Sequence, residues 1–453
     1  MKALDSAMEV AGSDPLAAAS ALRARGVPPE LASAALTQVE LRRRAVAKFG
    51  ADAASMFFTR AGLEQATRAV VAERRARRLA AAGVRTLADL GCGLGSDAMA
   101  AARAGISVYA VDADPETAAM AAANAEALGL DVRVECADAT TVPVERYDAV
   151  FADPARRKAG RGRVFDPRSY SPPWDFIASL PERVPRTVLK LAPGIDHGLL
   201  PPGAEGEWTS VDGDLVEAAF WCGPLAEVRR RATLLREKSD KSVAKMGGAW
   251  LGGAAGSGGA QVGGAGRAGL GGAAVGGAQV GGAEVGGAEL GGAQMGGAGV
   301  GGAQVGGAEM DGAQVGVSEL TGSGLEKAPV GAVGAFLYDP DGAVVRSHLV
   351  AELGAVIGGR LGDPEIAYLY TDEAVATPFA RRLEITDVMP FSLKRLRALL
   401  RERGVGRIEI RKRGSALEPE QLRKDLRLSG PHGASLVLTR VAGAPTVILC
   451  RPI

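Results

Sequence analysis

Residues 84–236 alternate short apolar strands with helices, and this alternation restricts the fold of the 453-residue chain more than any other feature. The strand-like segments are VRTLADLG, SVYAVDA, VRVECAD, YDAVFAD and TVLKLAP, and the helical ones include SDAMAAARAG and PETAAMAAANAEALGL. Strands that alternate with helices of this length predict a parallel sheet with right-handed crossovers, and therefore an α/β fold. Two later segments, LVEAAFWCG and RRATLLRE, are expected to form a final antiparallel pair.

Changes in composition divide the chain into four segments. Residues 1–82 are rich in Ala, Arg and Leu and predict a helical region, residues 83–246 hold the predicted sheet, and residues 329–453 predict an α+β domain. Residues 247–328 contain a glycine-rich five-residue repeat that begins at Gly271. We interpret this segment as a flexible linker, because two glycines per repeat raise the entropic cost of ordering it. The alternative is a pentapeptide-repeat β-helix, which the repeat faintly resembles.

A helix expected over residues 63–81 carries five arginines, and we interpret them as a solvated helix face. These residues are Arg68, Arg74, Arg75, Arg77 and Arg78. Long cationic side chains are seldom fully buried unless they are paired, which favours this interpretation.

Composition excludes several classes of protein. The formal net charge of +1 gives no overall attraction to nucleic acid or membrane, so any such attraction must be local. The four cysteines are far apart, with no CxxC pair, and only three histidines are present, so no metal site is expected. The sequence contains no apolar run of about 18 residues and no secretory signal, so we expect a cytoplasmic protein without a membrane partner.

A glycine-rich turn, DLGCGLGSD, begins at Asp89 directly after a predicted strand and opens a helix. Glycines let the backbone approach a ligand, and a helix N-terminus favours anionic groups. The turn departs from the dinucleotide-binding pattern GxGxxG, because its sixth position is Ser96. The acid followed by Gly91, Gly93 and Gly95 resembles motif I of class I S-adenosylmethionine (SAM) methyltransferases.

Three more aspartates follow in the order that this resemblance requires, each at the end of a predicted parallel strand. The resemblance implies that Asp112 binds the ribose hydroxyls of SAM and that Asp138 binds its adenine amino group. Asp153 falls at motif IV, where these enzymes bind the molecule that accepts the methyl group. Ligands of such sheets bind at the carboxyl ends of the strands, which agrees with all three positions.

Motif IV reads Asp153-Pro154-Ala155-Arg156 in the segment FADPARRKAGR. In amino-methylating relatives it reads Asp/Asn-Pro-Pro-aromatic, and the resemblance implies that Asp153 and the Pro154 carbonyl accept hydrogens from a target nitrogen. An aromatic ring that stacks on the base is missing, although the guanidinium of Arg156 can also stack. Arg156 and Arg157 either hold phosphates beside the site or form a solvated loop.

The segment also resembles the motif of RNA uracil-C5 methyltransferases, which need a cysteine nucleophile after the next strand. This chain has Lys190-Leu191-Ala192-Pro193 there. Cys222 lies on a later strand and is expected to pack in the core. The missing nucleophile argues against methylation of carbon.

The chain outside the glycine-rich segment resembles bacterial class I methyltransferases with a C-terminal THUMP-like domain. The similarity lies in LEQATR, DLGCGLGSD, VDADP, FADPARR, LKLAPGID, IEIRKRG, LRKDLRL and LVLTRV. It implies that Gln65 and Thr67 approach the methionine end of SAM and that the C-terminal domain binds RNA. Residues 391–427 contain twelve Lys or Arg and five acids. Within this range Arg411, Lys412 and Arg413 are the first candidates for phosphate contacts.

The sequence therefore predicts a SAM-dependent methyltransferase that methylates a base nitrogen of RNA, either tRNA or rRNA. Two alternatives stay open. One is a small-molecule or protein methyltransferase whose appended domain is structural. The other is a non-catalytic RNA-binding protein that keeps SAM for stability.

Overall fold

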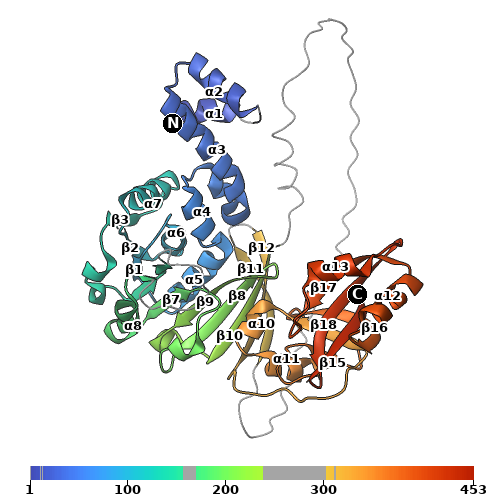
Figure 1. Ribbon diagram of the computed structural model, residues 1–453. Coiled ribbons are helices and arrows are strands. Elements are labelled where there is room, and N and C mark those ends of the chain that lie inside the picture. Colours follow the sequence, from blue (N-terminus) through green and yellow to red (C-terminus); the bar gives the residue numbers. More distant parts are fainter. Residues whose placement is uncertain are drawn as a thin grey trace, which may run out of the picture. The chain divides into compact units, whose positions relative to one another are not determined.

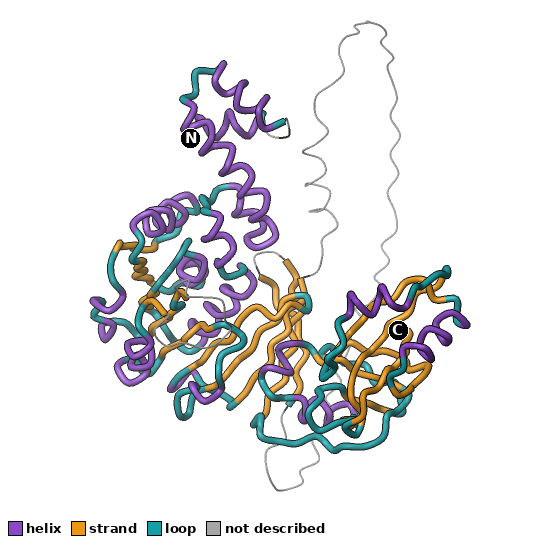
Figure 2. The backbone as a smooth tube through the Cα atoms, in the orientation of Figure 1, coloured by secondary structure: helices purple, strands orange, loops and turns teal. Residues whose placement is uncertain are grey.

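The computed structural model describes residues 2–10, 12, 14–156, 170–237, 302–310 and 313–452 (Figure 1). The chain begins with helices, as Figure 2 shows. They are α1 (Lys2–Glu9), α2 (Pro15–Ala24), α3 (Pro29–Phe49), the 3-10 helix η1 (Gly50–Ala54), α4 (Arg60–Gln65) and α5 (Ala69–Ala81). The single helix expected over residues 63–81 is thus two helices, with a break between Gln65 and Ala69.

A ten-stranded sheet has the order β11-β12-β10-β8-β9-β7-β4-β1-β2-β3. Its strands are β1 (Thr86–Leu90), β2 (Ser107–Asp112), β3 (Val132–Cys136), β4 (Ala149–Ala152), β7 (Thr187–Leu191), β8 (Glu205–Val211), β9 (Asp214–Trp221), β10 (Arg230–Glu237), β11 (Ala303–Met310) and β12 (Ala313–Gly322). The run from β3 to β7 is parallel throughout. The predicted α/β fold with a parallel sheet is confirmed.

The predicted antiparallel pair is wrong, because β8 lies between its two members. β9 pairs antiparallel with β8, and β8 pairs parallel with β10. The sequence of β8, EGEWTSV, carries two glutamates and looks like a solvated loop. Both glutamates are buried against arginines, which is why their charge does not prevent a strand.

Helices cover both faces of the sheet, since alternate strand residues belong to different cores. Leu87 packs with the buried residues of α5 and of α6 (Ser96–Arg103). Its neighbour Ala88 packs in a second core that includes α8 (Trp174–Arg183). Helix α7 (Pro115–Ala127) joins β2 to β3, and the two-stranded ribbon β5 (Ala155–Arg156) and β6 (Tyr170–Ser171) follows β4.

A seven-stranded sheet forms the C-terminal part, in the order β14-β15-β13-β16-β19-β18-β17. Its elements are β13 (Phe336–Pro340), α10 (Gly342–Arg346), α11 (Val350–Ile357), β14 (Arg360–Leu361), β15 (Leu369–Thr371), β16 (Ala380–Pro390), α12 (Leu393–Glu402), β17 (Val405–Lys412), α13 (Pro419–Leu426), β18 (His432–Val441) and β19 (Ala444–Pro452). Helices α12 and α13 share one hydrophobic core with β17, β18 and β19. Helices α10 and α11 instead bury Val344 and Leu353 in the second core of the ten-stranded sheet. The boundary expected at residue 329 therefore does not coincide with a break in the core.

Residues 303–310 and 313–322 are strands, so the linker interpretation is wrong for these two ranges. Strand β12 pairs with β11 on one side and with β10 on the other. Glycine becomes sparse after Gly316, and Val315 and Leu320 are buried. Burying these side chains and completing a sheet edge offsets the entropy that a glycine-rich repeat would lose. The repeat over residues 247–301 lies outside the described residues, as do residues 238–246.

Among the five arginines near α5, Arg75 is buried and Arg74 and Arg78 are only slightly exposed, so the solvated interpretation is wrong for these three. Arg75 donates to Asp97 and Glu217, and Arg78 lies 2.7 Å from Glu205. Arg74 pairs with Glu207 at 2.7 Å and also with Glu319. The facing strands carry these carboxylates on the side that meets α5, and buried charges persist only when they are paired. By contrast, the side chain of Arg77 is 47% exposed.

None of the helices in the described ranges has the length and apolar character needed to span a membrane. Within the same ranges no group of three or more His, Cys, Asp or Glu side chains is arranged to hold a metal ion.

Candidate functional site

A cavity of about 790 Å³ opens at the carboxyl ends of β1, β2, β3, β4 and β7. It brings together eight of the residues predicted from the sequence: Gln65, Thr67, Gly91, Gly93, Asp112, Asp138, Asp153 and Pro154. These residues come from four strand ends and from the segment before α5, so only the sheet topology makes them neighbours.

The glycine turn after β1 forms the floor of this cavity. Gly91 has a φ of 87°, a left-handed conformation that favours glycine. A Cβ atom at Gly91 would also lie 3.1 Å from the carbonyl oxygen of Asp153. The turn can therefore pass close to motif IV only because this position is glycine.

Asp112 ends β2 and is fixed by two backbone N–H groups. The N–H of Gly93 donates to Oδ2 at 3.1 Å, and the N–H of Asp114 donates to Oδ1 at 3.0 Å. Each carboxylate oxygen keeps further lone pairs that can accept hydroxyl hydrogens from a ligand in the cavity. This arrangement suits a pair of ribose hydroxyls.

Asp138 follows β3 and caps the short 3-10 helix η2 (Ala139–Thr141). The N–H and the hydroxyl of Thr140 both donate to Oδ1, at 2.9 and 2.8 Å. These hydrogen bonds hold the pKa of Asp138 below its usual value, so the carboxylate stays ionised and can accept a hydrogen from an amino group.

Asp89 and Gly95 belong to the same turn but do not line the cavity. Gly95 is the N-cap of α6. Asp89 is fully buried, and neither of its carboxyl oxygens has a hydrogen-bond partner among the described residues. Burial, together with the charges of Asp97 and Asp153, raises its pKa well above the usual value. An orphaned buried carboxyl group under the glycine turn fits a site that is completed by a cationic ligand.

The break between α4 and α5 supplies another wall of the cavity. The ammonium of Lys48 donates to the carbonyl oxygens of Leu63, Glu64 and Ala66, which ends α4 and turns the chain. Thr67 then donates its hydroxyl to Asp97 at 2.6 Å. Gln65 and Thr67 thereby face the cavity, which a continuous helix would not allow.

Asp153 is held by a residue that the sequence analysis did not assign to the site. The ammonium of Lys190, at the end of β7, lies 2.5 Å from Oδ2 of Asp153 and lines the same cavity. Burial alone would lower the pKa of Lys190, but the charges of Asp153, Asp97 and Glu217 outweigh it and raise the pKa. A lysine inside the otherwise apolar strand TVLKLAP was the available sequence signal.

Tyr170 is a second residue that the sequence analysis missed. It lies on β6 opposite Arg156 of β5, and it lines the same cavity as Pro154. Sequence alone could not find it, because residues 157–169 separate it from motif IV and fall outside the described residues.

The structure describes most of the predicted substrate-binding residues, and those in the C-terminal part are paired with acids. Arg156 is placed only by its backbone, in β5, and Arg157 lies outside the described residues. In the C-terminal part, Arg411 and Arg413 both pair with Asp339, at 2.7 and 2.9 Å, and Lys412 pairs with Glu418 at 2.9 Å. Their charges are therefore largely neutralised within the fold, which weakens their candidacy as phosphate contacts.

The parallel sheet, the glycine turn and the ordered acids at the strand ends define a class I methyltransferase fold. Family models agree: a methyltransferase domain matches residues 87–156, a THUMP-like domain matches residues 380–452, and a domain of unknown function matches residues 1–45. A crystal structure from Porphyromonas gingivalis, assigned as a methyltransferase, shares the fold. Its TM-score is 0.62 at 19% identity, over 94% of this chain and 92% of that one.

Uncharacterized SAM-dependent methyltransferases from two strains of Mycobacterium tuberculosis are each 31% identical to this chain. The match covers 91% of this chain and 95% of each relative. The chain belongs to this family of SAM-dependent methyltransferases with a C-terminal THUMP-like domain, and SAM is its cofactor. The resemblance drawn from the motifs is thus confirmed.

Replacing Asp112 with alanine is expected to weaken SAM binding by about 1.5–3 kcal/mol, because charge-assisted hydrogen bonds to both ribose hydroxyls are lost. Isothermal titration calorimetry with SAM measures this change. Asp131, an exposed aspartate of the loop before β3, gives a matched Asp131→Ala control that should leave affinity unchanged. Unchanged affinity in Asp112→Ala would remove this residue from the cofactor site.

Proposed function

We propose that this methyltransferase modifies a base nitrogen of RNA. One observation carries the proposal: Asp153 and Pro154 of motif IV line the same cavity as the glycine turn and Asp112. An acid followed by a proline at this strand end resembles the acceptor site of amino-methylating enzymes.

The residues of the chain would act mainly by positioning. When bound, SAM supplies an electrophilic methyl group. Asp153 and the carbonyl oxygen of Pro154 would accept hydrogens from the target nitrogen and aim its lone pair at that group. Lys190 would keep the carboxylate of Asp153 in place, because its ammonium already lies against Oδ2. Tyr170 could provide the ring that motif IV lacks, since it lines the same cavity as Asp153 and Pro154.

The outer surface of α12 and α13 is the better candidate for RNA contact within residues 391–427. Five exposed cations there have no carboxylate within ion-pairing distance among the described residues: Lys394, Arg395, Arg401, Lys424 and Arg427. We call these five residues the α12–α13 surface. Both helices pack on the same strands and contact each other, so their outward charges add to one field. The THUMP-like match over residues 380–452 supports RNA as the partner.

The test compares modified nucleosides in RNA from cells with and without the gene. Loss of one methylated base in the deletion strain, restored by the purified protein with SAM, would establish the activity. If no nucleoside changes and labelled methyl groups enter proteins or small molecules instead, the protein is a methyltransferase of those substrates. If SAM binds but no methyl group is transferred, the non-catalytic alternative applies.

A triple variant of the α12–α13 surface, Lys394→Ala/Arg395→Ala/Arg401→Ala, should bind RNA more weakly, and its affinity should depend less on salt. Each lost phosphate contact on a single strand flattens the log–log slope by roughly 0.7, so three contacts change it by up to about 2. Filter binding at several salt concentrations measures both effects. The comparison variant Arg411→Ala/Lys412→Ala/Arg413→Ala should change the slope less, because those charges are paired within the fold. The opposite ranking would return the RNA contact to residues 411–413.

A further inference from the structure

Two consecutive arginines on β10 have opposite electrostatic environments. Successive side chains of a strand point to opposite faces of the sheet. Arg231 pairs with Glu205 at 2.8 Å, with Glu227 at 2.7 Å and also with Glu319. Arg230 is as deeply buried, at 7% exposure, yet no carboxylate in the described ranges lies within ion-pairing distance of it. Its only hydrogen bond to a described residue is to the carbonyl oxygen of Arg229, at 3.3 Å.

Basic and aromatic rings lie near the guanidinium of Arg230, while the carboxylate of Glu352 accepts from the N–H of Gly324, which lies against the Arg230 stem. Its guanidinium carbon lies 5.8 Å from the ring centre of Trp208, on which His197 stacks at 4.6 Å. His348 stacks on the other face of His197 at 3.8 Å. Burial and the charge of Arg229 lower the pKa of Arg230. Such a position is costly for a cation, because burial removes part of its hydration and no carboxylate pairs with it in exchange.

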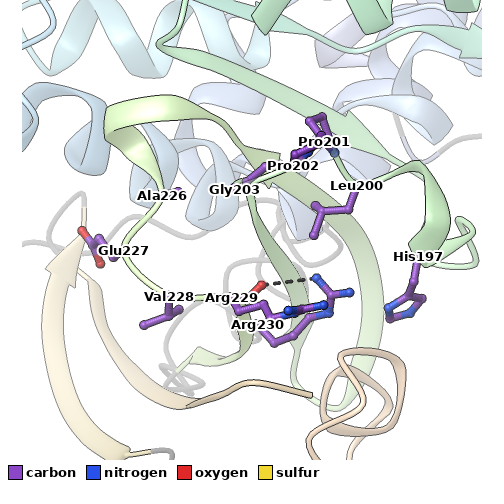
Figure 3. Close-up of a pocket in the computed structure, with 11 residues that line it drawn as sticks. His197, Leu200, Pro201, Pro202, Gly203, Ala226, Glu227, Val228, Arg229 and Arg230 are labelled. Atoms are coloured by element: carbon purple, nitrogen blue, oxygen red, sulfur yellow. Dashed lines mark hydrogen bonds between the residues drawn. The ribbon is translucent and has the colours of Figure 1, made fainter. Parts of the chain in front are cut away.

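The side chain of Arg230 lines a pocket of about 550 Å³, and this pocket shares no lining residue with the cofactor cavity. Figure 3 shows Arg229, Arg230 and His197 around this space, with a proline-containing loop above them. The Nδ1 atom of His197 is buried and has no hydrogen-bond partner among the described residues. Glu227 also lines the pocket, but its carboxylate is paired with Arg231 and its side chain is 63% exposed.

We propose that this pocket binds a phosphate group, held by the guanidinium groups of Arg229 and Arg230 with His197 beside them. An anion would supply the charge that Arg230 lacks, and phosphate offers several oxygens to the forked donors of two arginines. The phosphate can belong to a small molecule or to the backbone of an RNA. The proposal does not depend on the methylation of RNA.

The test measures thermal unfolding of the full-length protein with and without pyrophosphate at constant ionic strength. At about ten times its Kd, a ligand that binds only the folded state raises the melting temperature by roughly 2 °C. The wild type should show this rise. Arg230→Met should lose it, while its melting temperature without pyrophosphate stays level or increases, because a buried unpaired charge is gone. Arg229→Gln, at an exposed position, should weaken pyrophosphate binding at least tenfold and keeps the test valid if Arg230→Met folds poorly.

Arg236→Met is the matched control, since Arg236 lies on the same strand, is exposed and does not line the pocket. This variant should keep the response to pyrophosphate. The proposal is overturned if the wild type does not respond, or if Arg230→Met and Arg229→Gln respond as the wild type does.

Binding of total tRNA to the wild type and Arg230→Met then identifies the source of the phosphate, and this arm alone rests on the proposed RNA function. A salt slope lower by roughly 0.7 in Arg230→Met would assign the phosphate to RNA. An unchanged slope, with the pyrophosphate response lost, would assign it to a small phosphate-containing molecule.

Discussion

Replacing Asp153 with alanine is expected to lower methyl transfer at least about 100-fold, because the acceptor nitrogen loses the group that orients it. The affinity for SAM should stay within a few-fold of the wild type, since Asp153 lies beside the cofactor turn and pairs with Lys190 rather than with the turn itself. The measurement is transfer of labelled methyl groups to RNA from a strain that lacks the gene, with calorimetry of SAM binding in parallel.

Asp175→Ala is a suitable control for this experiment. Asp175 is an exposed aspartate in the first turn of α8, and its loss should change neither activity nor SAM binding. If Asp153→Ala retains turnover within a few-fold of the wild type, the acceptor is held by other residues. If the wild type itself transfers no methyl group to RNA, it is the RNA assignment that fails.

Replacing Arg75 with methionine is expected to lower the free energy of unfolding by about 3–5 kcal/mol. Arg75 is 4% exposed, lies over the ring of Phe151 at 4.7 Å, and donates to both Asp97 and Glu217. Without the guanidinium, two buried carboxylates lose their shared partner. Because Asp97 also holds Thr67 beside the cavity, SAM binding should weaken as well.

Urea denaturation followed by circular dichroism measures the loss, with Arg77→Met as the control. Arg77 lies on the same helix but is largely exposed, so its replacement should change stability by no more than about 0.5 kcal/mol. Equal effects of the two substitutions would show that the buried ion pairs contribute no more than a surface charge.

Local sequence patterns were sufficient for the parallel sheet, the glycine turn and the order of the acids along the strands. A strand, a turn with glycines at Gly91 and Gly93, and a helix are each specified by neighbouring residues. Because consecutive strands are parallel, their carboxyl ends lie at one edge of the sheet. Asp112, Asp138 and Asp153, which follow these ends, therefore line one cavity. The class of protein was therefore predictable from residues close in sequence.

The identity of long-range partners was decided only by the tertiary structure. Arg75 and Glu217 are 142 residues apart, and Arg411 and Asp339 are 72 residues apart. Charges on a helix or a turn look the same in sequence whether they face water or a buried carboxylate. Strand β8 was missed for the same reason, because its glutamates become compatible with a sheet interior only when arginines meet them. Strand β12 was assigned to the linker because of its glycines, and only its pairing with β10 and β11 shows that it is ordered. Lys190 likewise acquires a role only where β7 and β4 lie side by side and bring its ammonium to Asp153.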